Sequence, residues 1–250
     1  MRRWGRREGR APLVVAHRGA SRKALENTLA AFRLARDDGA DAVELDVRAC
    51  RSGEVVVFHD EDLRRLAGRP DRIAELPLEA VREVALVAAA GGGGISLLAE
   101  VLEELGPGML VNVEIKAPRA LAAGMGRLVA GVTRVVDACG AGARVLVSSF
   151  NPIALGMVRV LASGMATGLL CGSEQGRALR EGWARWLVRP AAVHPENVLV
   201  TEETVGRWRN EGLAVNVWTV DAESEVVRVT AAGVDGIITN DPAATRGFLA

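Results

Sequence analysis

Ionisable side chains follow directly after short apolar runs at several places in this chain. Apolar runs of four to six residues that end in polar or turn residues are typical of buried β-strands. The side chains placed in this way are two imidazoles, three carboxylates, a guanidinium and an ammonium group: His17, His59, Glu44, Asp46, Glu114, Arg18 and Lys116. Core packing does not explain such groups at the ends of several strands, so they indicate a catalytic or binding site.

The three carboxylates have the composition of an oxygen-only metal site. Glu44 and Asp46 are two residues apart, so on a strand their side chains share one face, and Glu114 follows a different strand. Hard cations such as Mg²⁺ or Ca²⁺ prefer oxygen ligands. Without a cation, three converging carboxylates would raise one another's pKa. The spacing alone leaves open a second interpretation, in which these acids lie on the surface and pair with arginines.

His17 and His59 have the chemistry of a general acid and a general base, because the unperturbed pKa of imidazole lies near neutrality. A single histidine after an apolar run is more often structural, but two of them beside Arg18 and the acidic residues favour catalysis. The third histidine, His194, precedes Pro195 and has no comparable neighbours. We therefore expect a structural role for His194.

Strand and helix patterns alternate along the chain, which predicts a parallel sheet covered by helices. Nine strands are predicted, but residues 48–53, between the second and the third, are too few for a parallel crossover, which needs about a dozen. We therefore predict an antiparallel hairpin of residues 44–47 and 55–58, which leaves eight parallel strands. Eight parallel strands with intervening helices make a (β/α)8 TIM barrel, an α/β fold whose active-site residues lie at the carboxyl ends of the strands.

Residues 61–94 depart from this alternation and contain Pro70, Pro77 and four consecutive glycines at 91–94. We interpret them as a small, lid-like insertion after the early hairpin, with an ordinary surface excursion as the alternative. Further along, residues 121–138 and 175–188 are each predicted to form one helix. With 250 residues, the whole chain is predicted to be a single catalytic domain.

The composition limits the class of protein. Lys and Arg (31) balance Asp and Glu (31), so no long-range field favours nucleic acid. The three cysteines lack metal-site spacing and are expected to be free thiols in a reducing compartment. No apolar stretch approaches the roughly 20 residues of a membrane span, and the run after the arginine-rich start is too short for a signal peptide. We expect a cytoplasmic protein without stable membrane insertion and with residues 1–10 frayed; the sequence does not indicate the oligomeric state.

Eight short motifs are spread over residues 13–242. They are His17-Arg18-Gly19, Leu25-Glu26-Asn27-Thr28, Glu44-Leu45-Asp46-Val47, Phe58-His59-Asp60, Val113-Glu114-Ile115-Lys116, Ser148-Ser149-Phe150, Val217-Trp218-Thr219-Val220 and Gly236-Ile237-Ile238-Thr239-Asn240. In residues and in order they resemble the glycerophosphodiester phosphodiesterase family. The family usually has proline where this chain has Leu25, so the loop there lacks the stiffening that a fixed φ provides.

The resemblance implies an activity and a role for each group. The activity is the hydrolysis of glycerophosphodiesters to sn-glycerol 3-phosphate and an alcohol such as choline or ethanolamine, with one divalent cation, Mg²⁺ or Ca²⁺, as cofactor. Glu44, Asp46 and Glu114 match the metal ligands of the family. His17 and His59 match its catalytic pair, in which one group removes a proton from the nucleophile and the other protonates the departing alkoxide.

Other residues are expected to hold the substrate. Arg18 by bidentate hydrogen bonds and Lys116 as a point charge would bind the phosphate, although both could also serve to balance the acids. Trp218 is expected to form an apolar wall of the substrate pocket, with core packing as the alternative. Glu26 either extends the metal shell or orients Arg18. The nucleophile is either water or a substrate hydroxyl that first gives a cyclic intermediate.

Two other functions stay open from the sequence. A lysophospholipase D-like enzyme would accept an acyl chain against apolar residues of the insertion, which are Ile73, Leu76, Leu78, Val84 and Leu86. A non-catalytic barrel that binds a phosphoester or a partner belongs to a different class. Such a protein would be expected to lack one of the histidines or acids, and all of them are present.

Overall fold

The computed structural model describes residues 4–5, 9–87, 93–116 and 124–250. Within them, eight parallel strands close into a barrel, because β1 pairs with β2 on one side and with β9 on the other. These strands are β1 (Leu13–His17), β2 (Ala42–Ala49), β4 (Leu110–Ile115), β5 (Val145–Ser149), β6 (Ala166–Cys171), β7 (Ala192–Pro195), β8 (Ala214–Val217) and β9 (Gly236–Thr239). The predicted (β/α)8 TIM barrel is confirmed.

The predicted hairpin is also confirmed. β3 (Val55–Val57) is antiparallel to β2, with Val47 opposite Val57, and it lies outside the closed set of eight strands. Just beyond it, the backbone N–H of Phe58 donates to the carbonyl of Asp46 at 2.9 Å. The hairpin therefore brings His59 to the end of β2 that carries Asp46.

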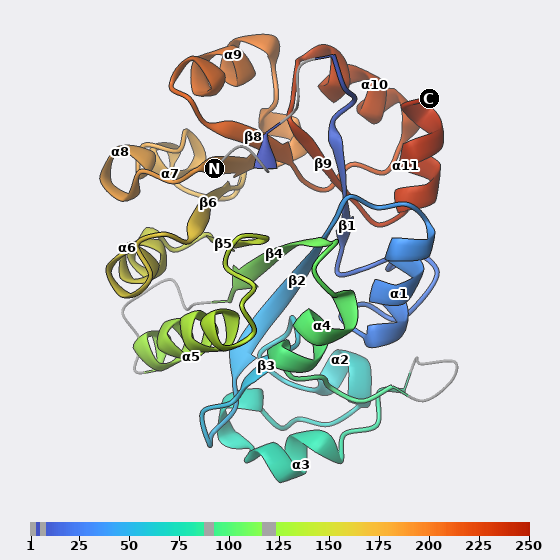
Figure 1. Cartoon of the computed structure of the whole chain (residues 1–250), viewed down its shortest axis with the longest axis vertical. Coiled ribbons are helices and arrows are strands. Elements are labelled where there is room, and N and C mark those ends of the chain that lie inside the picture. The colour runs from blue at the N-terminus through green and yellow to red at the C-terminus, as the bar shows by residue number, and fades with distance from the viewer. Residues whose placement is uncertain (1–3, 6–8, 88–92, 117–123) are drawn as a thin grey trace.

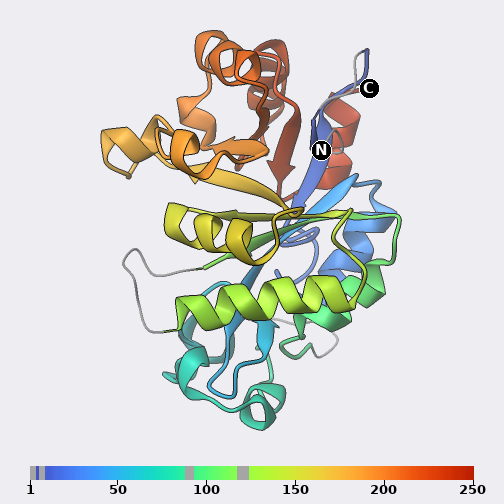
Figure 2. The same cartoon turned by 60° about the vertical axis from the view of Figure 1, so that its left-hand side comes forward.

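Helices surround the strands on the outside (Figures 1 and 2). The longer ones are α1 (Leu29–Asp37), α4 (Leu98–Leu105), α5 (Met125–Ala138), α6 (Pro152–Leu161), α9 (Glu202–Asn210), α10 (Glu223–Ala231) and α11 (Pro242–Phe248). Helices α1, α6, α9 and α11 begin after residues whose side chains accept a backbone N–H of the first turn, which are Thr28, Asn151, Thr201 and Asp241. Such caps satisfy N–H groups that have no partner within the helix.

Residues 175–188 form two short helices, α7 (Arg177–Arg180) and α8 (Arg185–Val188), where the sequence pattern predicts one. Gly182 between them has φ of +69°, in the left-handed region that interrupts a right-handed helix. The prediction of a single helix is therefore wrong. For α5, the predicted first residues near 121 lie outside the described part of the chain.

Trp4 closes the N-terminal end of the barrel. Its side chain is 4% exposed and packs with five buried strand residues: Val15, Ala42, Leu146, Ala192 and Ile238. The expectation that residues 1–10 are frayed is wrong at this position, because a large apolar ring gains more from burial than the chain end loses in freedom. Residues 1–3 and 6–8 lie outside the described part.

The insertion at residues 61–94 contains α2 (Arg64–Ala67), the 3₁₀ helix η2 (Ile73–Glu75) and α3 (Leu78–Arg82), which lie beside β3 (Figure 1). Its apolar side chains form a separate small core with residues of the hairpin. The buried members of this core are Cys50, Val56, Phe58, Leu63, Leu66, Ile73, Val81, Val84, Leu86 and Ile95. These side chains are used for internal packing, while residues 88–92 lie outside the described part and the lid-like role stays a prediction.

His194, on β7, is fully buried, which agrees with the structural role expected for it. Gly168 leaves room for the ring, since a Cβ at that position would lie 2.8 Å from His194 Nε2. The Nδ2 of Asn216 lies 3.2 Å from the same ring nitrogen. Burial lowers the pKa of His194 to about 3, so the ring is neutral in the folded protein at ordinary pH.

This buried histidine is expected to make the protein acid-sensitive. The unfolded chain takes up a proton at His194 below about pH 6.5, whereas the folded protein does so only near pH 3. Between about pH 6.5 and pH 3, His194 should therefore lower the free energy of unfolding by about 1.4 kcal/mol for each unit that the pH falls. Above about pH 6.5 this loss of stability is absent.

Urea unfolding of the wild type and of His194→Gln at several pH values between 8 and 5 tests this expectation. The variant should be less stable at pH 8 but should lose stability more slowly as the pH falls. At pH 8 both side chains are neutral, so this pH serves as the reference for the packing change. If the free energies of unfolding of the wild type and of His194→Gln changed with pH in parallel, His194 would take up its proton at the same pH in the folded protein as in the unfolded chain.

Candidate active site

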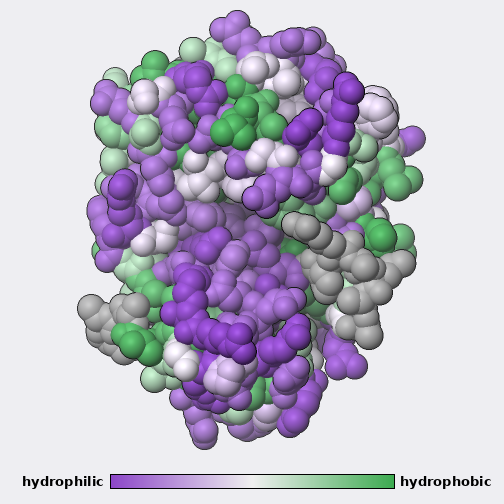
Figure 3. Space-filling view, turned by 180° about the vertical axis from the view of Figure 1, so that it is seen from behind, coloured by the Kyte–Doolittle hydropathy of each residue, from purple (hydrophilic) through white to green (hydrophobic). Residues whose placement is uncertain are grey.

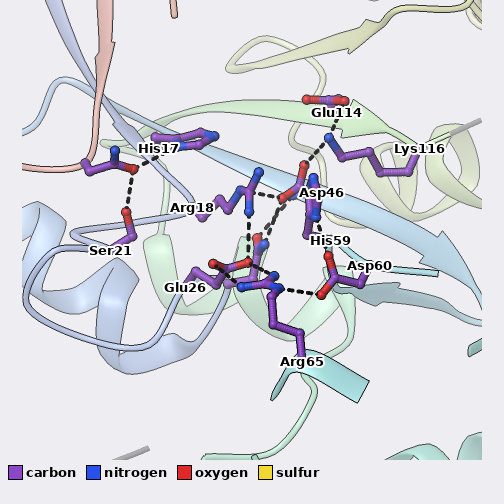
Figure 4. A network of polar contacts seen from close by, with 12 residues as sticks. His17, Arg18, Ser21, Glu26, Asp46, His59, Asp60, Arg65, Glu114 and Lys116 are labelled. Atoms are coloured by element: carbon purple, nitrogen blue, oxygen red, sulfur yellow. Dashed lines mark hydrogen bonds and ion pairs between the residues drawn. The ribbon is translucent and has the colours of Figure 1, made fainter. Parts of the chain in front are cut away.

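The predicted site residues come together at the carboxyl ends of β1, β2 and β4 and just after β3. His17 is the last residue of β1, Glu44 and Asp46 lie on β2, and Glu114 lies on β4. Figure 3 views the molecule from behind relative to Figure 1 and shows a hydrophilic hollow near the middle of that face. Figure 4 shows His17, Asp46, His59 and Glu114 in one group with Arg18 and Lys116.

A tight turn after β1 places Arg18 beside the acids. Arg18 has φ of +57° and Gly19 has φ of +86°. A Cβ at Gly19 would lie 2.7 Å from the backbone of Ala31, so the close approach to helix α1 requires glycine here. The turn directs the backbone N–H of Arg18 at Glu44 Oε2, which accepts it at 3.0 Å.

The three carboxylates form one cluster. Glu44, Asp46 and Glu114 are 3%, 0% and 7% exposed, and each offers an oxygen within 4.8 Å of the others. The parallel register places Asp46 opposite Glu114 on the neighbouring strand. Oε1 of Glu44 is buried and accepts no hydrogen bond from the described residues. Such a buried oxygen needs a partner, and a hard divalent cation fits this all-oxygen set.

Two cationic side chains compensate part of the negative charge. The Nζ of Lys116 lies 2.6 Å from Glu114 Oε1 and 3.0 Å from Asp46 Oδ1. The Nε of Arg18 lies 3.1 Å from Asp46 Oδ2, on the other side of the same carboxylate. Asp46 is therefore held between the two groups that are predicted to bind phosphate.

The electrostatic environments of the three acids differ. Burial raises the pKa of Glu44, and the charges of Asp46 and Glu114 raise it further. Burial also raises the pKa of Glu114, although Lys116 opposes it. Burial acts in the same direction on Asp46, but Lys116 and Arg18 outweigh it and hold that pKa well below its usual range. Asp46 is thus ionised at any ordinary pH, and Glu44 is the acid that most lacks a compensating charge.

His17 is oriented by a chain of hydrogen bonds from β9 and the loop after β8. Asn240 Nδ2 donates to Asp221 Oδ2 at 2.6 Å, so the other amide atom, Oδ1, is the acceptor that faces His17 Nδ1 at 2.8 Å. Nδ1 of His17 therefore carries the proton, and Nε2, 3.9 Å from Glu44 Oε2, has a free lone pair when the ring is neutral. Burial, together with the charge of Arg18, lowers the pKa of His17 and favours this neutral form.

His59 follows the hairpin, and its orientation comes from a carboxylate. Its Nδ1 donates to Asp60 Oδ1 at 2.7 Å. Burial lowers the pKa of His59, and Asp46 acts in the opposite direction. Both histidines thus use Nδ1 for the hydrogen bond that orients the ring, which leaves the two Nε2 atoms for proton transfer.

Trp218 lies at the carboxyl end of β8, beside a cavity of about 580 Å³. Its ring packs edge-to-face on Phe150, with the centroids 5.5 Å apart, and its Nε1 donates to the carbonyl of His194 at 2.7 Å. Glu196, Gln175 and Leu179 also line the cavity. Trp218 is therefore anchored by packing and at the same time borders a space next to the strand ends.

Several residues in and around the site were given no role by the sequence analysis. Asn27 donates from Nδ2 to Asp46 Oδ2 at 2.8 Å and accepts the N–H of Asp46 at 3.2 Å. Asn27, Asp60 and Asn240 belong to the eight motifs that resemble the family, so the sequence could have indicated these three residues. Asp221 and Arg65 stand outside those motifs. Glu26 pairs with Arg18 at 2.9 Å and is not part of the carboxylate cluster, which favours the predicted contact with Arg18 over a place in the metal shell.

Comparison with known proteins agrees with this geometry. The model of the glycerophosphoryl diester phosphodiesterase family matches residues 17–244, which include all of the site residues described above. The chain belongs to the glycerophosphoryl diester phosphodiesterase family. It is therefore a phosphodiesterase of the hydrolase class on a TIM barrel, as its sequence motifs indicate.

Relatives in this family cover almost the whole chain. A glycerophosphodiester phosphodiesterase of Caldanaerobacter subterraneus is 36% identical over 238 residues, which are 92% of this chain and 94% of the relative. A probable glycerophosphodiester phosphodiesterase 1 of Mycobacterium tuberculosis is 34% identical over 95% of this chain and 92% of its own length.

Solved structures of the family have the same fold. A putative glycerophosphoryl diester phosphodiesterase from Silicibacter pomeroyi superposes with a TM-score of 0.90 at 25% identity, covering 98% of this chain and 95% of the other. An Oleispira antarctica phosphodiesterase, solved in complex with the product sn-glycerol-3-phosphate, has a TM-score of 0.82 at 27% identity and covers 95% and 96% of the two chains. The family match, the barrel fold and the cluster of site residues at the strand ends thus lead to the same assignment.

Proposed function

We propose that this protein hydrolyses glycerophosphodiesters to sn-glycerol 3-phosphate and an alcohol, in a reaction that depends on a divalent cation. The observation that carries the proposal is the carboxylate cluster of Glu44, Asp46 and Glu114 beside two histidines whose Nε2 atoms accept no hydrogen bond from the described residues. Membership of the family supports the same activity, and so does the product bound in the Oleispira relative.

Glu44, Asp46 and Glu114 are the residues that would hold the cation, Mg²⁺ or Ca²⁺. When bound, it would neutralise charge on the phosphoryl oxygens. Arg18 and Lys116 lie on either side of Asp46 and supply the positive charges that would hold the phosphate. The organic part of the substrate would then extend from the phosphate toward Trp218 and the adjoining cavity.

The two histidines divide the proton transfers. His17, neutral with its lone pair on Nε2, accepts the proton of the attacking hydroxyl as the new P–O bond forms. The bond from phosphorus to the alcohol oxygen then breaks, and His59 donates a proton to that oxygen. Burial lowers the pKa of His59, and the contact of Nδ1 with Asp60 offsets part of this effect and fixes the ring for the donor role. Either water or a neighbouring substrate hydroxyl can be the nucleophile in this arrangement.

Neither alternative function gains an observation. Ile73, Val84 and Leu86 are packed inside the core of the insertion, so they do not offer a surface for an acyl chain. No helix in the described residues is long and apolar enough to cross a bilayer. All the histidines and acids needed for catalysis are present, which disfavours a non-catalytic barrel. The single-domain organisation, the small-molecule substrate, the absence of nucleic-acid binding and the cytoplasmic location remain part of this proposal.

An assay of purified protein on glycerophosphocholine tests the proposal. We expect release of choline and sn-glycerol 3-phosphate in equal amounts, with Mg²⁺ or Ca²⁺ added, and little release in EDTA. The variant His17→Ala/His59→Ala, prepared in parallel, controls for contaminating phosphodiesterases. Hydrolysis equal in the wild type and this variant would reject the assignment, and so would a failure to hydrolyse any glycerophosphodiester with either cation.

A further inference from the structure

Arg65, in helix α2 of the insertion, lies between the carboxylates of Glu26 and Asp60 and contacts both (Figure 4). Its Nη1 and Nη2 lie 3.0 Å and 2.6 Å from the two oxygens of Glu26. Its Nε lies 2.6 Å from Asp60 Oδ2. A guanidinium can use its fork on one carboxylate and its Nε on another, whereas the ammonium group of lysine has no such fixed geometry.

Each of these carboxylates contacts a residue with a proposed role in the reaction. Glu26 Oε1, which Arg65 holds, also accepts from Arg18 Nη1 at 2.9 Å. Asp60 uses Oδ2 for Arg65 and Oδ1 for His59. Arg65 therefore lies one carboxylate away from the phosphate-binding arginine and one carboxylate away from the proposed proton donor.

We propose that Arg65 is a positioning residue that sets both the charge available on Arg18 and the orientation of His59. The proposal rests on the proposed phosphodiesterase function. It assigns to the insertion an indirect part in the reaction, through one side chain.

The effect on Arg18 is electrostatic and depends on how the negative charge of Glu26 is shared between Arg18 and Arg65. Arg18 and Arg65 share Glu26, and Arg65 takes both of its oxygens. Because Arg65 shares the charge of Glu26, less of the positive charge of Arg18 is taken up by Glu26 and more is left for a phosphate. Without Arg65, Glu26 has Arg18 as its remaining ion-pair partner among the described residues, and the two would neutralise each other. Phosphate would then compete with a carboxylate for the same guanidinium.

The effect on His59 is geometric. Asp60 is a short side chain whose carboxylate can rotate, and Arg65 fixes one of its oxygens. The other oxygen is then directed at His59 Nδ1, which fixes the orientation of the ring. Loss of this contact leaves the ring held by Asp60 alone, and small misplacements of a catalytic group reduce turnover strongly.

A purely structural role as a staple for the insertion accounts less well for these contacts. The insertion is already fixed by its own core, in which Leu63, Leu66 and Ile73 pack with Phe58 of the hairpin. The ion pairs of other arginines of the insertion are with acids of the same segment or of helix α4, such as Arg72 with Glu61 and Arg82 with Glu100. Arg65 instead contacts acids that themselves contact Arg18 and His59.

The first experiment compares Arg65→Gln with Arg64→Gln. Arg64 is the preceding residue of α2, its side chain is 72% exposed, and it pairs only loosely with Asp62 at 3.8 Å. We expect Arg65→Gln to lower kcat/KM for glycerophosphocholine by about 10–100-fold, as for other partners that orient catalytic groups, with Arg64→Gln near wild type. Arg65→Lys should recover only part of the loss. Equal activity of Arg65→Gln and Arg64→Gln would overturn the proposal.

The second experiment separates the two effects and excludes a staple. In Arg65→Gln, KM should rise because Glu26 neutralises Arg18, and kcat should fall because His59 is less well held. Adding Glu26→Gln to Arg65→Gln removes the competing carboxylate, so KM should return toward the wild-type value while kcat stays low. A structural staple predicts the opposite, a double variant at least as impaired in KM as the single one.

A binding measurement distinguishes failure of this proposal from failure of the proposed function. Calorimetric titration with sn-glycerol 3-phosphate, with the same divalent cation present throughout, needs no turnover. Affinity should fall in Arg65→Gln and recover in the double variant. If the wild type bound the product but hydrolysed no glycerophosphodiester, the function would fail while the role toward Arg18 would stand. Unchanged affinity in Arg65→Gln would reject that role.

Discussion

Replacing either catalytic histidine, as His17→Ala or His59→Ala, is expected to lower kcat by about 10²–10⁴-fold, the usual effect of losing a general acid or base. Each ring uses Nδ1 for a fixing contact, with Asn240 or with Asp60, and so presents only Nε2 for proton transfer. The third histidine of the chain, His194, is fully buried on β7 and is not placed to take over the proton transfer. Steady-state hydrolysis of glycerophosphocholine measures the effect.

Folding should change far less than activity in these variants. The two side chains lie at strand ends and retain 20% and 31% exposure, so the free energy of unfolding should change by less than about 2 kcal/mol. Urea unfolding and titration with sn-glycerol 3-phosphate provide the controls. Near wild-type turnover by His59→Ala would remove it from the mechanism, whereas a loss of activity that matched a loss of folded protein would indicate a structural role.

Binding of Mg²⁺ or Ca²⁺ is expected to stabilise the protein as well as to activate it. Three buried carboxylates in one cluster repel one another, and Lys116 and Arg18, which pair with Asp46 and Glu114, supply only two positive charges. A cation that binds only the folded state stabilises it by about 2.7 kcal/mol at 100 times its Kd. Thermal unfolding with and without the cation, after exhaustive chelation, should show a higher Tm with the cation present.

Glu114→Gln should reduce the cation-dependent rise in Tm and the activity together, because one ligand charge is lost while the shape is kept. Glu103→Gln is the matched control, since Glu103 is an exposed acid of the helix that precedes β4. A rise in Tm that was the same in Glu114→Gln and in the wild type would place the cation elsewhere. Full activity after chelation, with the removal of metal verified by elemental analysis, would contradict the metal-dependent reaction.

The sequence by itself determined the class of fold and most of the residues at the site. Apolar runs that end in polar groups located the strand ends, because side chains at the carboxyl ends of parallel strands share one face of a barrel. The short connection at residues 48–53 separated the antiparallel β3 from the eight barrel strands, since a parallel crossover cannot be that short. These inferences succeeded because they depend on local spacing and on chain length.

The tertiary structure decided the contacts that orient these residues. Asn240 lies 223 positions from His17 in the chain, and Arg65 reaches Glu26 across 39 positions, so no local pattern indicates either pair. The burial of Trp4 depends on an opening that exists only once eight strands have closed. Periodicity also could not show that the apolar residues of the insertion pack among themselves. Which groups meet depends on how distant segments pack, and the identity of a strand-end residue does not contain that information.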